Sequence, residues 1–198
     1  MTLPRFYPIF DDVRWLHRML PLGVKLVQLR LKDLPGDALR AQIAEGRDLC
    51  RDHGALLVVN DHWRLAIELG CDWLHLGQED LDTADLHAIR AAGLKLGVST
   101  HDGAELARAL TLNPDYVALG PIYPTVLKQM KWHRQGVEKL TDWKARIGAI
   151  PLIAIGGMTV ERAPGAFAAG ADVVSAVTDI TLNADPEARV RHWLETCG

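Results

Sequence analysis

The chain has 198 residues, a length typical of one domain. Its 22 Lys and Arg nearly balance its 25 Asp and Glu, and the net charge of −3 excludes the strongly basic balance of nucleic-acid or anionic-membrane binders. A hydrophobic content of 48% supports a sizeable core and argues against a disordered chain. We therefore expect one domain over residues 1–198, with neither a nucleic-acid nor a membrane partner.

The same sequence indicates a cytoplasmic protein. No apolar run approaches the roughly 18 residues that span a bilayer, and residues 1–12 lack the apolar stretch of a signal peptide. Cys50, Cys71 and Cys197 are far apart and form no CxxC pair. We expect them to be small buried side chains in a reducing compartment rather than disulfide or zinc ligands.

Short apolar segments alternate with longer amphipathic ones along the whole chain. In chain order, the expected strand and helix pairs are 6–10 with 11–20, 24–30 with 37–53, 55–60 with 61–69, 73–77 with 83–92, 95–99 with 103–112, 116–120 with 137–147, 152–156 with 160–169, and 173–177 with 186–196. Most of the strands are continuously apolar, as in a parallel sheet covered on both faces. Eight such pairs predict a single α/β domain, a (β/α)₈ TIM barrel. A doubly wound open sheet is the alternative, because periodicity alone does not close a sheet.

Two helix starts carry recognisable signals. Asp82 and Thr83 are the expected caps of the helix near residue 83, and Asp185 caps the last helix, with Pro186 in its first turn. The irregular segment 121–135 is too long for an ordinary strand–helix loop, which makes it a candidate functional loop. Trp132 in this loop is either a lid aromatic or a surface anchor.

Polar side chains gather where the strands end, and in a TIM barrel the chemistry lies at the C-terminal strand ends. Arg30 and Lys32 alternate at the end of the second strand, so both can point the same way, and Lys128 lies in the long loop. Three such cations suit phosphate oxygens, although an isolated Lys or Arg is more often only a surface residue.

Asp61 and Asp80 end two neighbouring strands. Two carboxylates without a Cys or His cluster suit Mg²⁺, which shares oxygens with substrate phosphates. Helix capping is the competing interpretation, since both residues precede helices. Asn60 is either a further hydrogen-bonding group or an ordinary turn residue.

The last two strands end in residues suited to a phosphate. Gly156 and Gly157 follow the seventh strand, and Val177 and Thr178 follow the eighth, where barrels often hold phosphate with backbone N–H groups. The histidines show no HxxxH or HxH spacing. We therefore expect His62, His75 and His101 to be hydrogen-bonding scaffold or rim residues rather than metal ligands.

Six segments occur together in a familiar order: VQLRLKD (27–33), VNDH (59–62), HLGQED (75–80), GVST (97–100), GPIYPT (120–125) followed by Lys128, and AIGGM (154–158). In these segments the chain resembles the thiamine-phosphate synthase family, from about residue 24 to the last helix. The resemblance implies a Mg²⁺-dependent transferase. Such an enzyme joins 4-amino-2-methyl-5-(diphosphooxymethyl)pyrimidine to 4-methyl-5-(2-phosphooxyethyl)thiazole and releases thiamine phosphate and diphosphate.

The resemblance also implies roles for individual residues. It assigns the pyrimidine diphosphate to Gln28, Arg30, Lys32, Asn60, Ser99 and Lys128, of which Arg30, Lys32, Ser99 and Lys128 would be catalytic. It assigns Mg²⁺ to Asp61 and Asp80, and the thiazole phosphate to Thr125, Gly157, Val177 and Thr178. No protein nucleophile is expected, because diphosphate departs before the thiazole nitrogen attacks.

The chain departs from the family pattern in three places. Leu31 stands where Glu is usual, at a position expected to point away from the site. Leu127 stands where a second Thr is usual, beside the thiazole phosphate, which affects affinity or substrate identity. The first strand, residues 6–10, lacks the usual Thr-Asp ending.

Two other functions compete with the synthase. A thiazole tautomerase-like isomerase would carry His where this chain has Pro121, and would tend to lack the carboxylates Asp61 and Asp80. A non-catalytic barrel that binds thiazole phosphate or thiamine phosphate would not need the full set of cations and carboxylates. The sequence does not indicate the oligomeric state.

Overall fold

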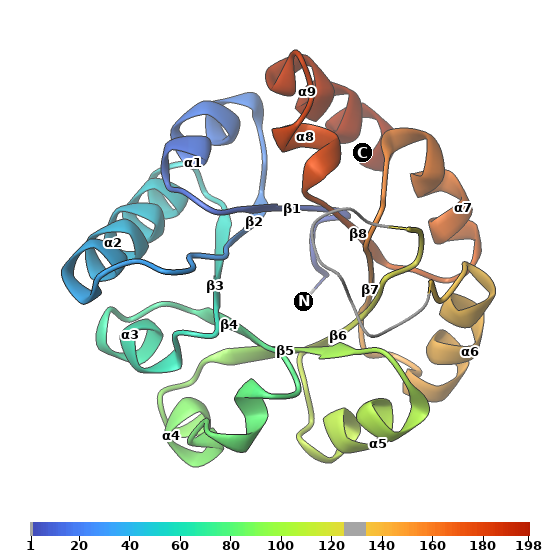
Figure 1. Cartoon of the computed structure of the whole chain (residues 1–198), viewed down its shortest axis with the longest axis horizontal. Helices are drawn as coiled ribbons and strands as arrows, with labels where there is room; N and C mark the ends of the chain where they lie inside the picture. The colour runs from blue at the N-terminus through green and yellow to red at the C-terminus, as the bar shows by residue number, and fades with distance from the viewer. Residues whose placement is uncertain (1, 125–133) are drawn as a thin grey trace.

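The structure is a computed structural model that describes residues 2–124 and 134–198, and in it eight parallel strands form a closed barrel (Figure 1). The strands are β1 (Phe6–Phe10), β2 (Leu26–Leu29), β3 (Leu56–Asn60), β4 (Trp73–Leu76), β5 (Lys95–Thr100), β6 (Tyr116–Leu119), β7 (Leu152–Ile155) and β8 (Val173–Ala176). Phe6 of β1 pairs with Val174 of β8, which closes the sheet. The (β/α)₈ barrel is confirmed, and the open sheet is excluded.

Helices surround the barrel as an outer ring (Figure 1). Within the described residues, the α-helices are α1 (Arg14–Met19), α2 (Gly36–Asp52), α3 (Trp63–Glu68), α4 (Leu86–Ala91), α5 (Gly103–Thr111), α6 (Glu138–Ile147), α7 (Ala163–Ala168), α8 (Thr178–Thr181) and α9 (Pro186–Cys197). The 3₁₀ helices are η1 (Leu20–Leu22), η2 (Asp80–Asp82) and η3 (Val160–Arg162). None of these helices combines the length and the apolar character needed to cross a membrane.

Helix starts differ from the prediction where a better cap lies nearby. Helix α4 begins at Leu86 because the side chain of Asp85 accepts the Ala88 N–H at 2.9 Å. The expected cap at Asp82 and Thr83 was wrong, since Asp82 lies within η2 and Thr83 ends it. The predicted start of the last helix is confirmed, because Asp185 caps α9 with Pro186 in the first turn.

Alternation along the strands divides the core into two layers. The inner layer fills the barrel and includes Tyr7, Val58, Tyr116 and Ile153, and Leu3 joins it from the N-terminal segment. The start of the chain accordingly lies within the ring of strands in Figure 1. A larger outer layer packs the strands against the helices. The strands are therefore buried on both faces, which explains why they are almost continuously apolar.

Two carboxylates fix neighbouring strands at the N-terminal end of the barrel. Asp115, just before β6, accepts the backbone N–H of Leu96 at 2.8 Å. Asp172, just before β8, accepts the backbone N–H of Leu152 at 2.7 Å. Each bond joins a strand to its predecessor, so these aspartates hold the strand register at the end opposite the candidate site.

Candidate active site

Two carboxylates and one ammonium group lie close together at the C-terminal ends of β3 and β4. Asp61 follows β3 with a left-handed backbone (φ +64°), and its N–H donates to the His75 carbonyl at 3.0 Å. Lys32 Nζ donates to Asp61 Oδ2 at 2.5 Å. Burial raises the pKa of Asp80 above its ordinary value, and the adjacent Asp61 carboxylate raises it further. At this edge of the barrel the negative charges of Asp61 and Asp80 lie close together, and the positive charge of Lys32 offsets one of them.

Neither carboxylate caps an α-helix. Helix α3 has His62 as its N-cap residue, without a side-chain cap bond, while the carboxylate of Asp61 is turned to Lys32. Asp80 Oδ2 accepts the N–H of Gly77 at 3.1 Å, a bond within the loop after β4. The capping interpretation of Asp61 and Asp80 was therefore wrong.

The two carboxylates fit a hard divalent cation. Mg²⁺ prefers oxygen ligands, keeps several waters and is usually held by one or two carboxylates together with substrate phosphates. Across the described ranges, no group of three or more His, Cys, Asp or Glu side chains is arranged to hold a metal. Asp61 and Asp80 are the described carboxylates that would hold such a cation.

The two cations that follow β2 flank a buried leucine. Arg30 and Lys32 are exposed, whereas Leu31 between them is buried in the outer layer of the core, between the strands and the helices. The departure from the family pattern at Leu31 therefore points away from the site, as predicted. Burial lowers the pKa of His75 to about 4, and Asp61 and Arg30 act on that pKa in opposite directions, so both charges lie near this ring.

A chain of hydrogen bonds crosses the interior of the barrel. Gln28 Nε2 donates to Tyr7 Oη at 2.7 Å, and Tyr7 Oη lies 3.0 Å from Tyr116 Oη. Tyr116 Oη lies 2.8 Å from His75 Nδ1, and His75 Nε2 lies 2.8 Å from Ser99 Oγ. Burial raises the pKa of both tyrosines, so their hydroxyls stay protonated. The candidate residues Gln28 and Ser99 thus lie at the two ends of one polar network.

Two histidines near the C-terminal strand ends have hydrogen-bonding partners, and Asn60 is buried at the end of its strand. Asn60 is buried at the end of β3 and pairs in register with His75. His62 Nε2 lies 2.9 Å from the Leu31 carbonyl, and His101 Nδ1 lies 2.7 Å from Glu105 Oε2. The hydrogen-bonding role expected for His62, His75 and His101 is confirmed.

Gly156 and Gly157 follow β7, and α8 follows the neighbouring strand β8. Gly157 has a left-handed backbone (φ +62°), and a Cβ built there would lie 2.8 Å from the Tyr123 Cβ, so the turn requires glycine. Directly after β8, the neighbour of β7, Val177 is the N-cap residue of α8 and Thr178 is its first residue. Four further residues singled out in the sequence lie outside the described residues: Thr125, Leu127, Lys128 and Trp132.

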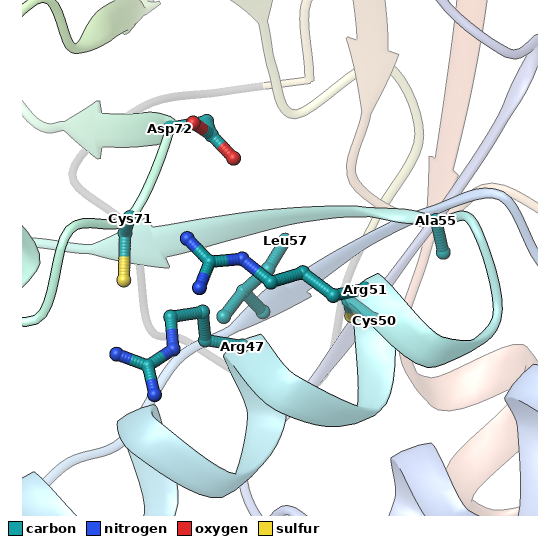
Figure 2. A pocket seen from close by; sticks show the side chains of 7 residues that line it. All are labelled: Arg47, Cys50, Arg51, Ala55, Leu57, Cys71 and Asp72. Carbon is teal, nitrogen blue, oxygen red and sulfur yellow. The ribbon is translucent and has the colours of Figure 1, made fainter.

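A separate cavity of about 20 Å³ lies between α2 and the N-terminal ends of β3 and β4, lined by Arg47, Cys50, Arg51, Ala55, Leu57, Cys71 and Asp72 (Figure 2). Its volume suits about one water molecule and is too small for a phosphorylated substrate. Burial raises the pKa of Cys50 to about 12 and that of Cys71 to about 11. These thiols are protonated and unreactive, and the expectation of small buried cysteines is confirmed.

Comparison with known proteins identifies the family. The family profile described as thiamine monophosphate synthase matches residues 6–180. The chain belongs to this thiamine monophosphate synthase family. It is 59% identical to a thiamine-phosphate synthase of Rhizobium etli, over 98% of this chain and 95% of that protein. It is 46% identical to a thiamine-phosphate synthase of Neisseria meningitidis serogroup A, over 94% of this chain and 91% of that protein.

A solved structure of similar fold is consistent with membership of the thiamine monophosphate synthase family. Thiamine phosphate pyrophosphorylase from Pyrococcus furiosus superposes with a TM-score of 0.87 at 24% identity, covering 98% of this chain and 95% of that one. Together with the names of the relatives, the family match favours a synthase over a tautomerase-like isomerase or a non-catalytic barrel.

Sequence reasoning missed the two tyrosines of the buried network. Tyr7 and Tyr116 lie in apolar strands, where the sequence pattern predicts ordinary aromatic residues of the core. The available signal was a phenol at an inward-facing strand position in each of two strands, because a buried hydroxyl needs a partner. That signal predicts a polar bond inside the barrel but does not say which side chains make it.

Proposed function

We propose that this chain joins the pyrimidine diphosphate to the thiazole phosphate and releases thiamine phosphate and diphosphate. The observation that carries the proposal is the pair of carboxylates, Asp61 and Asp80, beside Lys32 at adjacent strand ends of a barrel of this family. A carboxylate pair next to cations is suited to a metal-bound diphosphate.

The charge balance of the rim supports a role for Mg²⁺ and for Lys128. Among the described groups, Arg30 and Lys32 carry two positive charges that cancel those of Asp61 and Asp80. A diphosphate ester carries roughly three negative charges near neutrality, which these four groups leave uncompensated. Mg²⁺ and the ammonium of Lys128 would supply three positive charges.

The reaction needs no protein nucleophile. The bond between the pyrimidine methylene carbon and the diphosphate oxygen breaks, and its electron pair leaves with the diphosphate. The lone pair of the thiazole nitrogen then forms the new carbon–nitrogen bond. When bound, Mg²⁺ neutralises part of the charge that develops on the departing diphosphate.

The residues of the chain orient the substrates and stabilise charge. Arg30, Lys32, Ser99 and Lys128 would bind the leaving diphosphate, where their contacts strengthen as charge develops. Gln28 and Asn60 would orient the pyrimidine half. The thiazole phosphate would be held by Thr125, Gly157, Val177 and Thr178. Positioning and electrostatics account for the rate in this scheme.

The test combines the purified protein with both substrates and Mg²⁺, and separates the products by chromatography. We expect thiamine phosphate and diphosphate in equal amounts, with no turnover when EDTA removes the metal. Omitting the pyrimidine diphosphate is the matched control. Isomerisation of a thiazole precursor without thiamine phosphate would instead identify a tautomerase, and tight binding of thiamine phosphate without turnover would identify a binding protein.

A further inference from the structure

The buried network has a direction that follows from counting donors. Gln28 Nε2 can only donate, so Tyr7 Oη accepts from it. Among the described residues, the remaining partner for the Tyr7 proton is Tyr116 Oη. The proton of Tyr116 must then go to His75 Nδ1, at 2.8 Å. In the opposite direction Tyr7 would accept two bonds, and its own buried proton would lack an acceptor.

The direction determines which nitrogen of His75 carries the proton. An Nδ1 that accepts from Tyr116 is unprotonated, so the neutral ring carries its proton at Nε2. Nε2 therefore donates to Ser99 Oγ at 2.8 Å. Ser99 Oγ uses a lone pair in that bond, and its own proton remains for a group in the site. Ser99 is partly exposed at the end of β5, where a substrate oxygen can reach it.

We propose that Tyr7, Tyr116 and His75 are positioning residues that present the hydroxyl proton of Ser99 to an anionic oxygen of the substrate diphosphate. The identity of that oxygen rests on the proposed function, whereas the direction of the network rests on the contacts alone. Because each donor in such a chain polarises the next, the network also makes Ser99 a stronger donor than an isolated serine.

Ring packing holds the central tyrosine in place. The Tyr116 ring stacks on His75, with centroids 5.6 Å apart, and on Trp73, with centroids 6.1 Å apart. It also lies against Gly97, where any Cβ would overlap ring atoms Cζ, Cε1 and Cε2 of Tyr116. With its ring confined on these sides, the hydroxyl cannot swing away from Tyr7 and His75.

A double-mutant cycle separates positioning from mere stability. We expect Tyr116→Phe to lower kcat about tenfold, as the loss of one oriented hydrogen bond does. In the Ser99→Ala background the same substitution should change kcat less than about twofold, because its effect passes through Ser99. Tyr7→Phe should follow the same pattern and serves as the second variant if Tyr116→Phe folds poorly. Equal effects in both backgrounds would overturn the proposal.

The matched control removes a neighbouring buried hydroxyl that faces the other way. Thr100 Oγ1 donates to the Ala118 carbonyl at 3.0 Å and accepts from Trp143 Nε1 at 2.9 Å, on the outer side of β5. Thr100→Val should lower thermal stability but leave kcat within about twofold in both backgrounds. A loss of kcat matching that of Tyr116→Phe would mean that any buried hydroxyl near the site has this effect, which would overturn the proposal.

The direction of the network can be read without any substrate. In ¹⁵N-labelled protein, NMR of the histidine rings reports the protonated nitrogen of His75, with His75→Gln providing the assignment. We expect protonation at Nε2 and an unprotonated Nδ1. Protonation at Nδ1 would reverse the network and overturn the inference. An inactive wild-type protein with the Nε2 tautomer would instead refute the proposed function and leave the direction of the network intact.

Discussion

Adding one methyl group at Gly97 should damage both stability and activity. A Cβ at this position overlaps the Tyr116 ring, so the ring must move away from β5. The movement strains a packed interior, which typically costs about 1–3 kcal/mol. It also breaks the Tyr116 hydrogen bonds to Tyr7 (3.0 Å) and His75 (2.8 Å), at about 1–3 kcal/mol for each group left buried without a partner. We expect Gly97→Ala to lower the free energy of unfolding by about 4 kcal/mol.

The measurement is urea unfolding followed by circular dichroism, with Gly165→Ala as the matched control. Gly165 lies in α7, and a Cβ there meets nothing within 4 Å. This control should be stabilised by about 0.5–1 kcal/mol, because alanine favours a helix over glycine. The folded fraction of Gly97→Ala should also lose most of its kcat. A loss of stability below about 1 kcal/mol with unchanged kcat would refute the reasoning, since it would mean that Tyr116 can shift without cost.

Three further substitutions test the charged rim and the long loop. Asp80→Asn should lower kcat at least about 100-fold, as measured by product formation at limiting Mg²⁺. The pKa of Asp80 is raised in the folded protein, so the wild type loses stability as the pH rises from the ordinary pKa of an aspartate through this raised pKa. In EDTA, Asp80→Asn should therefore have a higher melting temperature than the wild type at pH 7, but not near pH 3. Lys128→Ala should lower kcat on the order of 100-fold with little change in the thiazole phosphate KM, and a rise in that KM alone would place Lys128 at the other phosphate. Leu127→Thr should lower the thiazole phosphate KM roughly tenfold or more at similar kcat, and an unchanged or higher KM would contradict it.

The barrel itself could be predicted from the sequence because its strands are buried on both faces. Segments such as 6–10 and 152–156 are apolar enough to be predicted as buried strands from their own sequence, without knowledge of the strands that pair with them. The ends of the elements were less accurate, since local hydrogen bonds decide them. Asp85 competes with Asp82 and Thr83 for the same helix start, and only the structure shows which carboxylate reaches a free N–H.

The sequence likewise predicted some features of the candidate site and not others. The order of polar residues after the strands predicted that Asp61 and Asp80 would be neighbours, because parallel strands end at one rim. It could not predict that Lys32 turns to Asp61 rather than to solvent, since that depends on side-chain geometry. The bond from Tyr7 to Tyr116 joins residues 109 positions apart, and nothing in either local sequence encodes it.

The pairing of β1 with β8 has a consequence for how the protein is made. During synthesis β1 leaves the ribosome long before β8 (residues 173–176), the strand with which it pairs to close the barrel. Until then the nascent sheet exposes two unpaired edges, which are templates for association with other chains. The rim, to which residues from β2 to β8 contribute, is complete only after this closure. A chain truncated before β8 should therefore be a substrate for chaperones and proteases rather than a partly active enzyme.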